Sequence, residues 1–308
     1  MELRQIRYFK EVADARSFAK GAYKLRVAQP ALSRSVAGLE DEIGQMLFVR
    51  HTGGVTLTEV GTRFYQHAVD LLQRVQSLSD EMAAGADDPH GTISLGVPPS
   101  MQSTLTAPVV ASFLKKYPRV SVNVIQDTSV NLRAAITSGA LDLAITSTLM
   151  ASSGVRYTPL YTEAVCLVER AESPPLFSAP VVIRDLTGLP LMLCGYPNTV
   201  RLLLERAFAD ADEKIDFRCE VNTSSLLFDL VNEGAGVGIA PSCAMSSRKA
   251  SEFRLTPIKG LEFSWTIATS LDRVESAATK QLITMLTDHV EHAIKSGNWP
   301  TARFDWEP

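Results

Sequence analysis

The chain has 308 residues, of which 45% are hydrophobic, and a formal net charge of −4. This length and composition indicate a globular protein of two or three units, each able to bury its own core. The sequence has no apolar run of about eighteen residues, and its first residues carry charges where a signal peptide needs an apolar stretch. We therefore expect neither a membrane span nor export, and place the protein in the cytoplasm.

The charge is divided unevenly along the chain. Residues 1–58 hold nine Lys and Arg against six Asp and Glu, a net of +3, whereas residues 59–308 hold 21 against 28, a net of −7. Only the N-terminal end therefore suits a polyanionic partner. The four cysteines include no C-x-x-C pair, which argues against a zinc site and a disulfide scaffold. We take them as reduced core thiols and expect no metal or cofactor.

Apolar spacing predicts three helices at the N-terminal end. The first carries its apolar residues between Leu3 and Val12, and Ser17 is a good N-cap for a second that ends before Arg26. The third covers residues 28–40 and runs on to Ile43. Two short helices joined by a tight turn are typical of a helix-turn-helix.

The third helix has two different sides. Its apolar stripe is formed by Leu32, Val36, Leu39 and Ile43. Pro30 and Arg34 project from the opposite side with Ser33 on the flank, and the acidic residues come only at the C-terminal end. This arrangement suits insertion end-first into a DNA groove. From this stretch alone, an ordinary amphipathic surface helix is an equally good interpretation.

A small hairpin is predicted over residues 47–58. Two short β-prone runs flank Gly53 and Gly54, with Arg50, His51 and Thr52 at the tip. A basic hairpin beside a reading helix is a wing that holds DNA phosphates. The alternative is a hairpin with a purely structural role.

Residues 17–61 resemble the DNA-binding signature of LysR-type transcriptional regulators. The match includes Val-Ala-Gln-Pro-Ala-Leu-Ser-Arg-Ser-Val at 27–36 and extends through the hairpin to Gly61. The resemblance implies a winged helix-turn-helix, an activator or repressor that acts as a dimer or tetramer, and RNA polymerase as a partner. By position it implies DNA contacts from Gln29, Pro30, Ser33, Arg34, Arg50 and Thr52.

Thr58 can cap a long helix that starts at Glu59. Its apolar residues follow a four-three pattern and are Val60, Phe64, Ala68, Leu71, Val75 and Leu78. Because nothing within residues 1–85 is large enough to cover this stripe, we expect the same helix of a second chain to do so. Packing against the chain's own C-terminal unit is the alternative. A dimer would present two reading helices to an interrupted, roughly palindromic site on double-stranded DNA.

From Thr92 onward, β-prone runs alternate with amphipathic segments. We expect strands at 92–97, 120–126, 141–146, 159–168, 189–194, 215–221, 236–240, 253–257 and 263–269. We expect helices near 101–117, 129–138, 199–209, 224–233 and 274–295. Such repeated units imply an α/β fold with mostly parallel sheets that helices cover on both faces.

Hydroxyl-rich segments follow five of these strands, at the strand ends where α/β sheets bind ligands. Each segment could instead be a simple helix cap. Together they predict a small-molecule effector site, with Arg201 suited to a carboxylate. The side chains that we expect to line it are Ser100, Met101, Thr128, Thr146, Asn198, Arg201 and Thr223.

The LysR resemblance also implies a two-lobed effector domain similar to periplasmic binding proteins, with the ligand between the lobes. The expected division is 1–58 winged helix-turn-helix, 59–86 linker helix, 87–91 hinge, 92–295 effector domain and 296–308 tail. Lobe I would comprise 92–162 and 268–295, and lobe II 163–267. The tail would be docked or loosely ordered.

The rival interpretation is an enzyme or an exported binding protein with an added helical domain. The sequence has no nucleophile elbow, phosphate-binding loop or H-E-x-x-H motif. Its five histidines avoid the segments assigned to the cleft. We therefore expect a ligand-responsive regulator and no catalytic residues.

Overall fold

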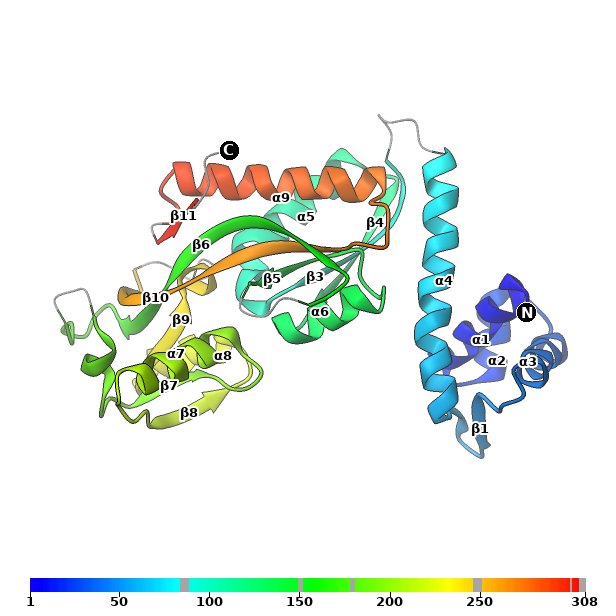
Figure 1. Cartoon of the computed structure of the whole chain (residues 1–308), viewed down its shortest axis with the longest axis horizontal. Helices are drawn as coiled ribbons and strands as arrows, with labels where there is room; N and C mark the ends of the chain where they lie inside the picture. The colour runs from blue at the N-terminus through cyan, green and yellow to red at the C-terminus, as the bar shows by residue number, and fades with distance from the viewer. Residues whose placement is uncertain (84–88, 149–151, 178–180, 246–250, 300, 305–308) are drawn as a thin grey trace. The chain divides into compact units, whose positions relative to one another are not determined.

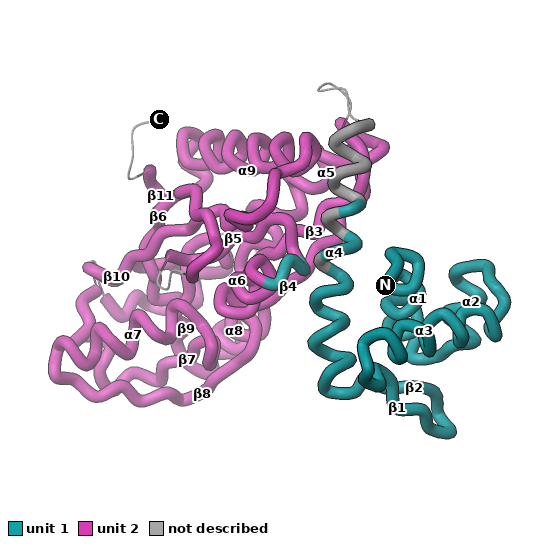
Figure 2. The backbone as a smooth tube through the Cα atoms, turned by 45° about the vertical axis from the view of Figure 1, so that its right-hand side comes forward, with its two compact units in different colours: residues 1–83, 138–140 teal, residues 84–137, 141–308 magenta. Residues whose placement is uncertain are grey.

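The computed structural model describes residues 1–83, 89–148, 152–177, 181–245, 251–299 and 301–304. The chain divides into two compact units (Figure 2). The N-terminal unit is residues 1–83, with which the short segment 138–140 is grouped, and the C-terminal unit holds the remainder. Within the described residues, every helix is too short or too polar to cross a membrane.

The N-terminal unit consists of three short helices, a hairpin and a long helix (Figure 1). The elements are α1 (Leu3–Ala15), α2 (Phe18–Leu25), α3 (Gln29–Ile43), β1 (Phe48–His51), β2 (Gly54–Leu57) and α4 (Glu59–Ala83). Ser17 caps α2 by accepting a hydrogen bond from the Lys20 N–H at 3.3 Å. Thr58 caps α4 in the same way by accepting from the Gly61 N–H at 2.8 Å. Both predicted caps are confirmed.

The first half of α4 packs within the N-terminal unit itself. The Phe64 ring meets Phe9 edge-on, with centroids 5.0 Å apart, and Ala68 is 2% exposed. Val60 is half-buried against the same core. Ala68 is thus already covered within the single chain, whereas Val60 and Phe64 keep part of their surface exposed, and their contact with a second chain stays a prediction. Phe9, which the Phe64 ring meets, belongs to α1, and α1 packs directly against α4.

Farther along α4, the predicted stripe is less covered. Leu71 is 37% exposed and Val75 is half-buried. The side chain of Leu78 lies outside the described residues. A contact with a second chain through this part of α4 stays a prediction.

The C-terminal unit is built on one sheet in the order β4-β3-β5-β10-β6-β9-β7-β8, with β11 added beside β6. The strands are β3 (Gly91–Val97), β4 (Val120–Gln126), β5 (Leu143–Ser147), β6 (Val155–Arg170), β7 (Leu191–Cys194), β8 (Phe217–Val221), β9 (Val237–Pro241), β10 (Phe253–Ser270) and β11 (Ala302–Arg303). The helices are α5 (Ala107–Lys116), α6 (Ser129–Thr137), α7 (Thr199–Asp210), α8 (Ser224–Asn232) and α9 (Ala277–Lys295).

Two long antiparallel strands, β6 and β10, join two lobes (Figure 1). In the first lobe β3 pairs parallel with β4 and β5, and in the second β7 pairs parallel with β8 and β9. Helices α5 and α9 pack together in the first lobe, α6 lies against β5, and α7 and α8 cover the second. The predicted parallel units are confirmed, and the joining pair makes the whole sheet mixed.

Strand β10 differs from the prediction in two ways. It is a single strand where two were expected, because the interruption between Pro257 and Glu262 only shifts the register against β6. Ala268 and Thr269 pair with β5 inside the first lobe. The second segment of lobe I was expected to begin at residue 268, whereas the pairing of β10 with β5 already begins at Trp265.

The predicted helix at 101–117 also differs in its first part. Residues 99–106 form a 3₁₀ turn, η1 (Pro99–Met101), and a π-helical turn, η2 (Gln102–Thr106), before α5 begins. These turns carry Ser100 to the carboxyl end of β3. The C-terminal tail was expected to be either docked or loosely ordered. Its described part is docked, since β11 pairs with β6.

Candidate DNA-binding surface and effector pocket

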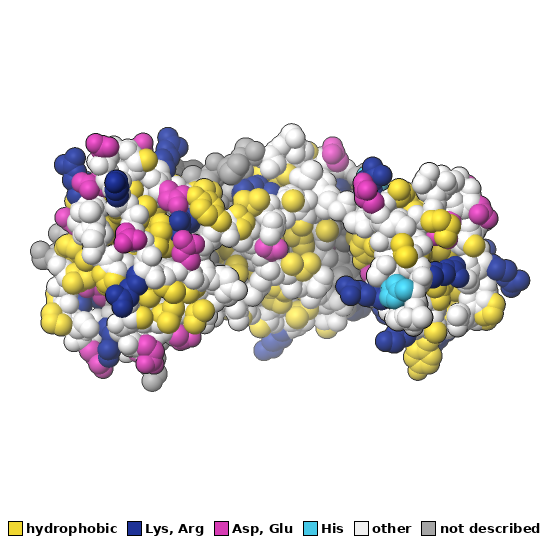
Figure 3. Space-filling view, turned by 90° about the horizontal axis from the view of Figure 1, so that it is seen from below, with side chains coloured by type: hydrophobic (Ala, Val, Ile, Leu, Met, Phe, Trp, Pro, Cys, Tyr) yellow, Lys and Arg dark blue, Asp and Glu magenta, His cyan; other side chains and the backbone are white. Residues whose placement is uncertain are grey.

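The N-terminal half of α3 presents its polar side chains to solvent. Gln29, Pro30 and Arg34 are exposed and Ser33 is half-buried, while Leu32 is fully buried against the core. Lys and Arg side chains project from several points of this unit (Figure 3). The predicted two-sided character of α3 is therefore present in the fold, and its free end can enter a groove.

Glu40 joins the other end of α3 to the hairpin. Its side chain is 5% exposed, and its Oε1 accepts hydrogen bonds from the N–H groups of Leu47 at 2.7 Å and Phe48 at 3.1 Å. The carboxylate thus satisfies two buried donors where β1 begins. From the sequence, Glu40 was only one of the acidic residues at the C-terminal end of the helix, and this role was not predicted.

The hairpin is held against α2. The Arg50 guanidinium lies over the Phe18 ring, 4.7 Å from its centroid, and Arg50 and Thr52 are exposed. Gly54 has φ 133°, and a Cβ at this position would lie 2.5 Å from the Arg16 carbonyl oxygen. Only glycine fits there, so the turn between β1 and β2 is fixed beside α2.

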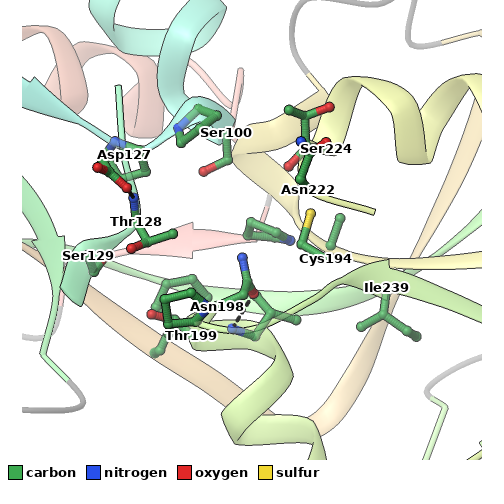
Figure 4. Close-up of a pocket in the computed structure, with 18 of the residues that line it drawn as sticks. Ser100, Asp127, Thr128, Ser129, Cys194, Asn198, Thr199, Asn222, Ser224 and Ile239 are labelled. Carbon is green, nitrogen blue, oxygen red and sulfur yellow. Dashed lines mark hydrogen bonds between the residues drawn. The ribbon is translucent and has the colours of Figure 1, made fainter. Parts of the chain in front are cut away.

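A pocket of about 70 Å³ lies between the two lobes of the C-terminal unit (Figure 4). Ser100 and Thr128 line it from the first lobe, and Asn198 and Thr223 line it from the second. These four predicted residues are thus brought together. The remaining lining residues are Pro98, Pro99, Asp127, Ser129, Cys194, Pro197, Thr199, Val200, Asn222, Ser224, Ile239, Ala240, Pro241, Phe263 and Trp265.

Three of the predicted lining residues also cap helices. Asn198 Oδ1 accepts from the Val200 N–H at 2.9 Å, and Thr223 Oγ1 accepts from the Leu226 N–H at 3.3 Å. Thr128 Oγ1 lies 3.5 Å from the N–H of Asn131 in α6. Each of these residues therefore both caps a helix and lines the pocket, so the starts of α6, α7 and α8 lie at the pocket.

Three other predicted lining residues lie elsewhere. Met101 is fully buried in the core, and Thr146 is fully buried, with its Oγ1 3.4 Å from that of Thr266. Arg201 turns away and forms ion pairs with Glu205 at 2.6 Å and Glu220 at 2.8 Å. The structure therefore does not place these three residues at this pocket.

The pocket has both polar and apolar lining residues and few ionisable groups. Among the described residues that line it there is no Lys, Arg or His, and the titratable groups are Asp127 and Cys194. Burial raises the pKa of the Cys194 thiol, against the opposing effect of a hydrogen bond with Ser224. The thiol is therefore protonated at neutral pH and is a weak nucleophile.

The sequence matches two family models. Residues 3–62 match the bacterial regulatory helix-turn-helix protein, lysR family, and residues 86–291 match the LysR substrate binding domain. The chain belongs to the LysR family. It is a DNA-binding transcriptional regulator with an effector-binding domain, and not an enzyme.

This LysR-type regulator is similar to characterised and uncharacterised relatives. It is 27% identical to the transcriptional regulator BbuR of Bordetella bronchiseptica over 94% of this chain and 90% of that protein. It is 35% identical to YcgK of Bacillus subtilis, an uncharacterised regulator, over 54% of this chain and 52% of that protein.

Solved structures share the fold. A variant of full-length OxyR from Pseudomonas aeruginosa gives a TM-score of 0.73 at 22% identity, over 94% of this chain and 97% of that one. CbnR in complex with its target DNA gives 0.68 at 20% identity, over 95% of this chain and 100% of that one.

Two aromatic residues of the pocket wall were not predicted from the sequence. Phe263 and Trp265 lie on β10, with ring centroids 4.9 Å apart, and both line the pocket. They sit in an alternating strand pattern without any hydroxyl-rich helix start. Their place becomes visible only once β10 is known to cross between the lobes.

Proposed function

We propose that this pocket is the effector site of the regulator. The observation that carries the proposal is that hydroxyl and amide side chains of both lobes, Ser100 and Thr128 against Asn198 and Thr223, line one small cavity. A ligand that contacts both lobes favours one lobe arrangement over others. Its differential affinity for the two arrangements supplies the coupling to DNA, typically about 1–3 kcal/mol.

The lining chemistry favours a small ligand with acceptor groups, of which a carboxylate is one. With Arg201 turned away, the available donors are hydroxyls, amides and the main-chain N–H groups at the starts of α6, α7 and α8. Phe263 and Trp265 offer an apolar face to the rest of the ligand. The lobes already touch beside the pocket, where Ser147 Oγ lies 2.7 Å from Thr199 Oγ1.

For DNA, we propose that α3 enters the major groove. Gln29, Pro30, Ser33 and Arg34 contact the bases, while Arg50 and Thr52 hold phosphates. The exposed part of α4 joins two chains, so the site is an interrupted palindrome. RNA polymerase is the partner through which the bound regulator activates transcription, and a repressor would exclude it. The similar CbnR structure is a complex with its target DNA, which supports this use of the fold.

These roles correspond to successive segments of the chain. We propose residues 1–58 as the DNA-binding domain, 59–86 as the linker helix, 87–91 as the hinge and 92–295 as the effector domain, acting in the cytoplasm. Residues 84–88, at the junction of linker helix and hinge, lie outside the described residues. Residues 265–270 are assigned to the first lobe, in keeping with their pairing to β5.

A thermal-shift screen of small aromatic and aliphatic acids, with neutral analogues, tests the pocket. A ligand that stabilises the protein should do so much less in Thr128→Val, which removes a lining hydroxyl. Thr146→Val is the matched control, because it makes the same change at a buried position outside the pocket. Equal loss of the ligand effect in both variants would contradict the assignment.

A further inference from the structure

A buried carboxylate lies behind the pocket wall, on β6 where the chain passes between the lobes. Glu163 is fully buried. Its Oε2 accepts from Ser242 Oγ at 2.7 Å and from the Cys243 N–H at 2.9 Å. Its Oε1 accepts from Trp265 Nε1 at 2.5 Å and from the Tyr161 hydroxyl at 3.4 Å. All four partners are donors.

Among the described residues, the partners of the Glu163 carboxylate are hydrogen-bond donors, and none forms an ion pair with it. A buried carboxylate without a cation is tolerated only when donors occupy its oxygens. Burial raises the pKa of Tyr161 and that of Cys243 well above their usual values, with Glu163 adding to both shifts. Tyr161 therefore stays a neutral donor.

The partners of Glu163 form part of the pocket wall. Trp265 lines the pocket, and so does Pro241, which directly precedes Ser242. The carbonyl oxygen of Cys243 in turn accepts from Thr104 Oγ1 of the first lobe at 3.1 Å. One carboxylate thus connects β6, β10 and the second-lobe turn η4 (Ser242–Met245), and that turn touches the first lobe.

Residues near the C-terminus also contact Glu163 and its partners. Thr301 Oγ1 donates to Ser242 Oγ, and Ala302 pairs with Glu163 in the sheet. Trp299 is 6% exposed and packs on Tyr161 with ring centroids 5.0 Å apart. This segment lies beyond residue 291, where the match to the LysR effector-domain model ends.

We propose that Glu163 is a positioning residue of the effector pocket. Its carboxylate fixes the Trp265 indole and the start of η4, and Thr301 holds this arrangement by donating to Ser242 Oγ. The inference rests on the proposed function, because it takes the pocket as the effector site. Glu163 acts through Trp265 and does not line the pocket itself.

The test uses the indole signal of Trp265. The full-length chain, labelled with ¹⁵N-tryptophan, has three tryptophans, and Trp265→Phe identifies the signal of interest. Glu163→Gln replaces an acceptor oxygen with a donor NH₂ while every partner of that group donates. We expect the Trp265 indole resonance to shift and to lose protection from solvent exchange. Hydrogen exchange should also rise in residues 98–106 and 241–245.

Glu169→Gln is the matched control. Glu169 is a second buried acid of β6, 3% exposed, and its Oε1 accepts from the Leu176 N–H at 2.9 Å, away from the pocket. This variant should leave the Trp265 signal unchanged.

An unchanged Trp265 signal in Glu163→Gln would overturn the proposal. If that variant does not fold, Ser242→Ala removes one donor and should shift the same resonance by less, and no shift there overturns it equally. These measurements need no effector. A failed ligand screen would therefore count against the proposed function alone.

Discussion

At the scale of single residues, we expect specific DNA binding by the N-terminal half of α3 to depend on Arg34. Its guanidinium is exposed on the side opposite the buried Leu32, where it can reach base edges. Arg34→Ala should weaken specific DNA binding by about 1–3 kcal/mol. Arg206→Ala, which removes an 81% exposed side chain from α7, should leave binding unchanged. Footprinting titrations measure both, and an unchanged footprint for Arg34→Ala would remove it from base reading.

The hydrogen bonds of Glu40 lead to a prediction about the stability of the N-terminal unit. Glu40→Ala leaves the Leu47 and Phe48 N–H groups buried without an acceptor, which should lower the free energy of unfolding by about 1–3 kcal/mol. Glu40→Gln keeps one acceptor oxygen, and in the structure a single oxygen serves both donors, so it should cost much less. Urea denaturation followed by circular dichroism compares the two. Equal destabilisation would show that charge, and not the acceptor, matters.

At the scale of elements, α4 has two parts with different roles. Phe64 belongs to the core of the N-terminal unit, so an acidic residue there would unfold this unit and say nothing about assembly. Leu71 is exposed, and Leu71→Asp should convert the oligomer to monomers while the fold is retained. Gln66→Asp adds the same charge on another side of α4 and should leave the oligomer intact. Sedimentation velocity distinguishes these outcomes, and an intact Leu71→Asp oligomer would place the interface elsewhere.

The elements themselves follow closely from local patterns. Ser17 and Thr58 cap the helices they were predicted to cap, because a hydroxyl before an apolar-periodic run satisfies free N–H groups whatever the tertiary fold. The coverage of Val60 and Ala68 could not be predicted in this way. Periodicity shows that a stripe must be buried but does not identify its partner, and here both residues pack in or against the core of the N-terminal unit.

At the scale of the whole molecule, the sequence predicted those pocket residues that directly follow the ends of parallel strands. Thr128 and Asn198 were found because a helix start after a parallel strand must face the ligand edge. Arg201 was not placed correctly, since the direction of a side chain one turn into α7 depends on its acidic neighbours Glu205 and Glu220. Trp265 was missed because its role depends on how β10 crosses between the lobes.

The central claim is that a ligand between the lobes changes the complex with DNA. The direct measurement is DNA affinity by fluorescence anisotropy, with and without a ligand from the thermal-shift screen, in the original chain and in Thr128→Val. We predict a ligand-induced change of about 5–150-fold in the original chain, no change in the variant, and equal ligand-free affinities for both. A ligand that binds the original chain yet changes neither DNA affinity nor footprint would contradict the account.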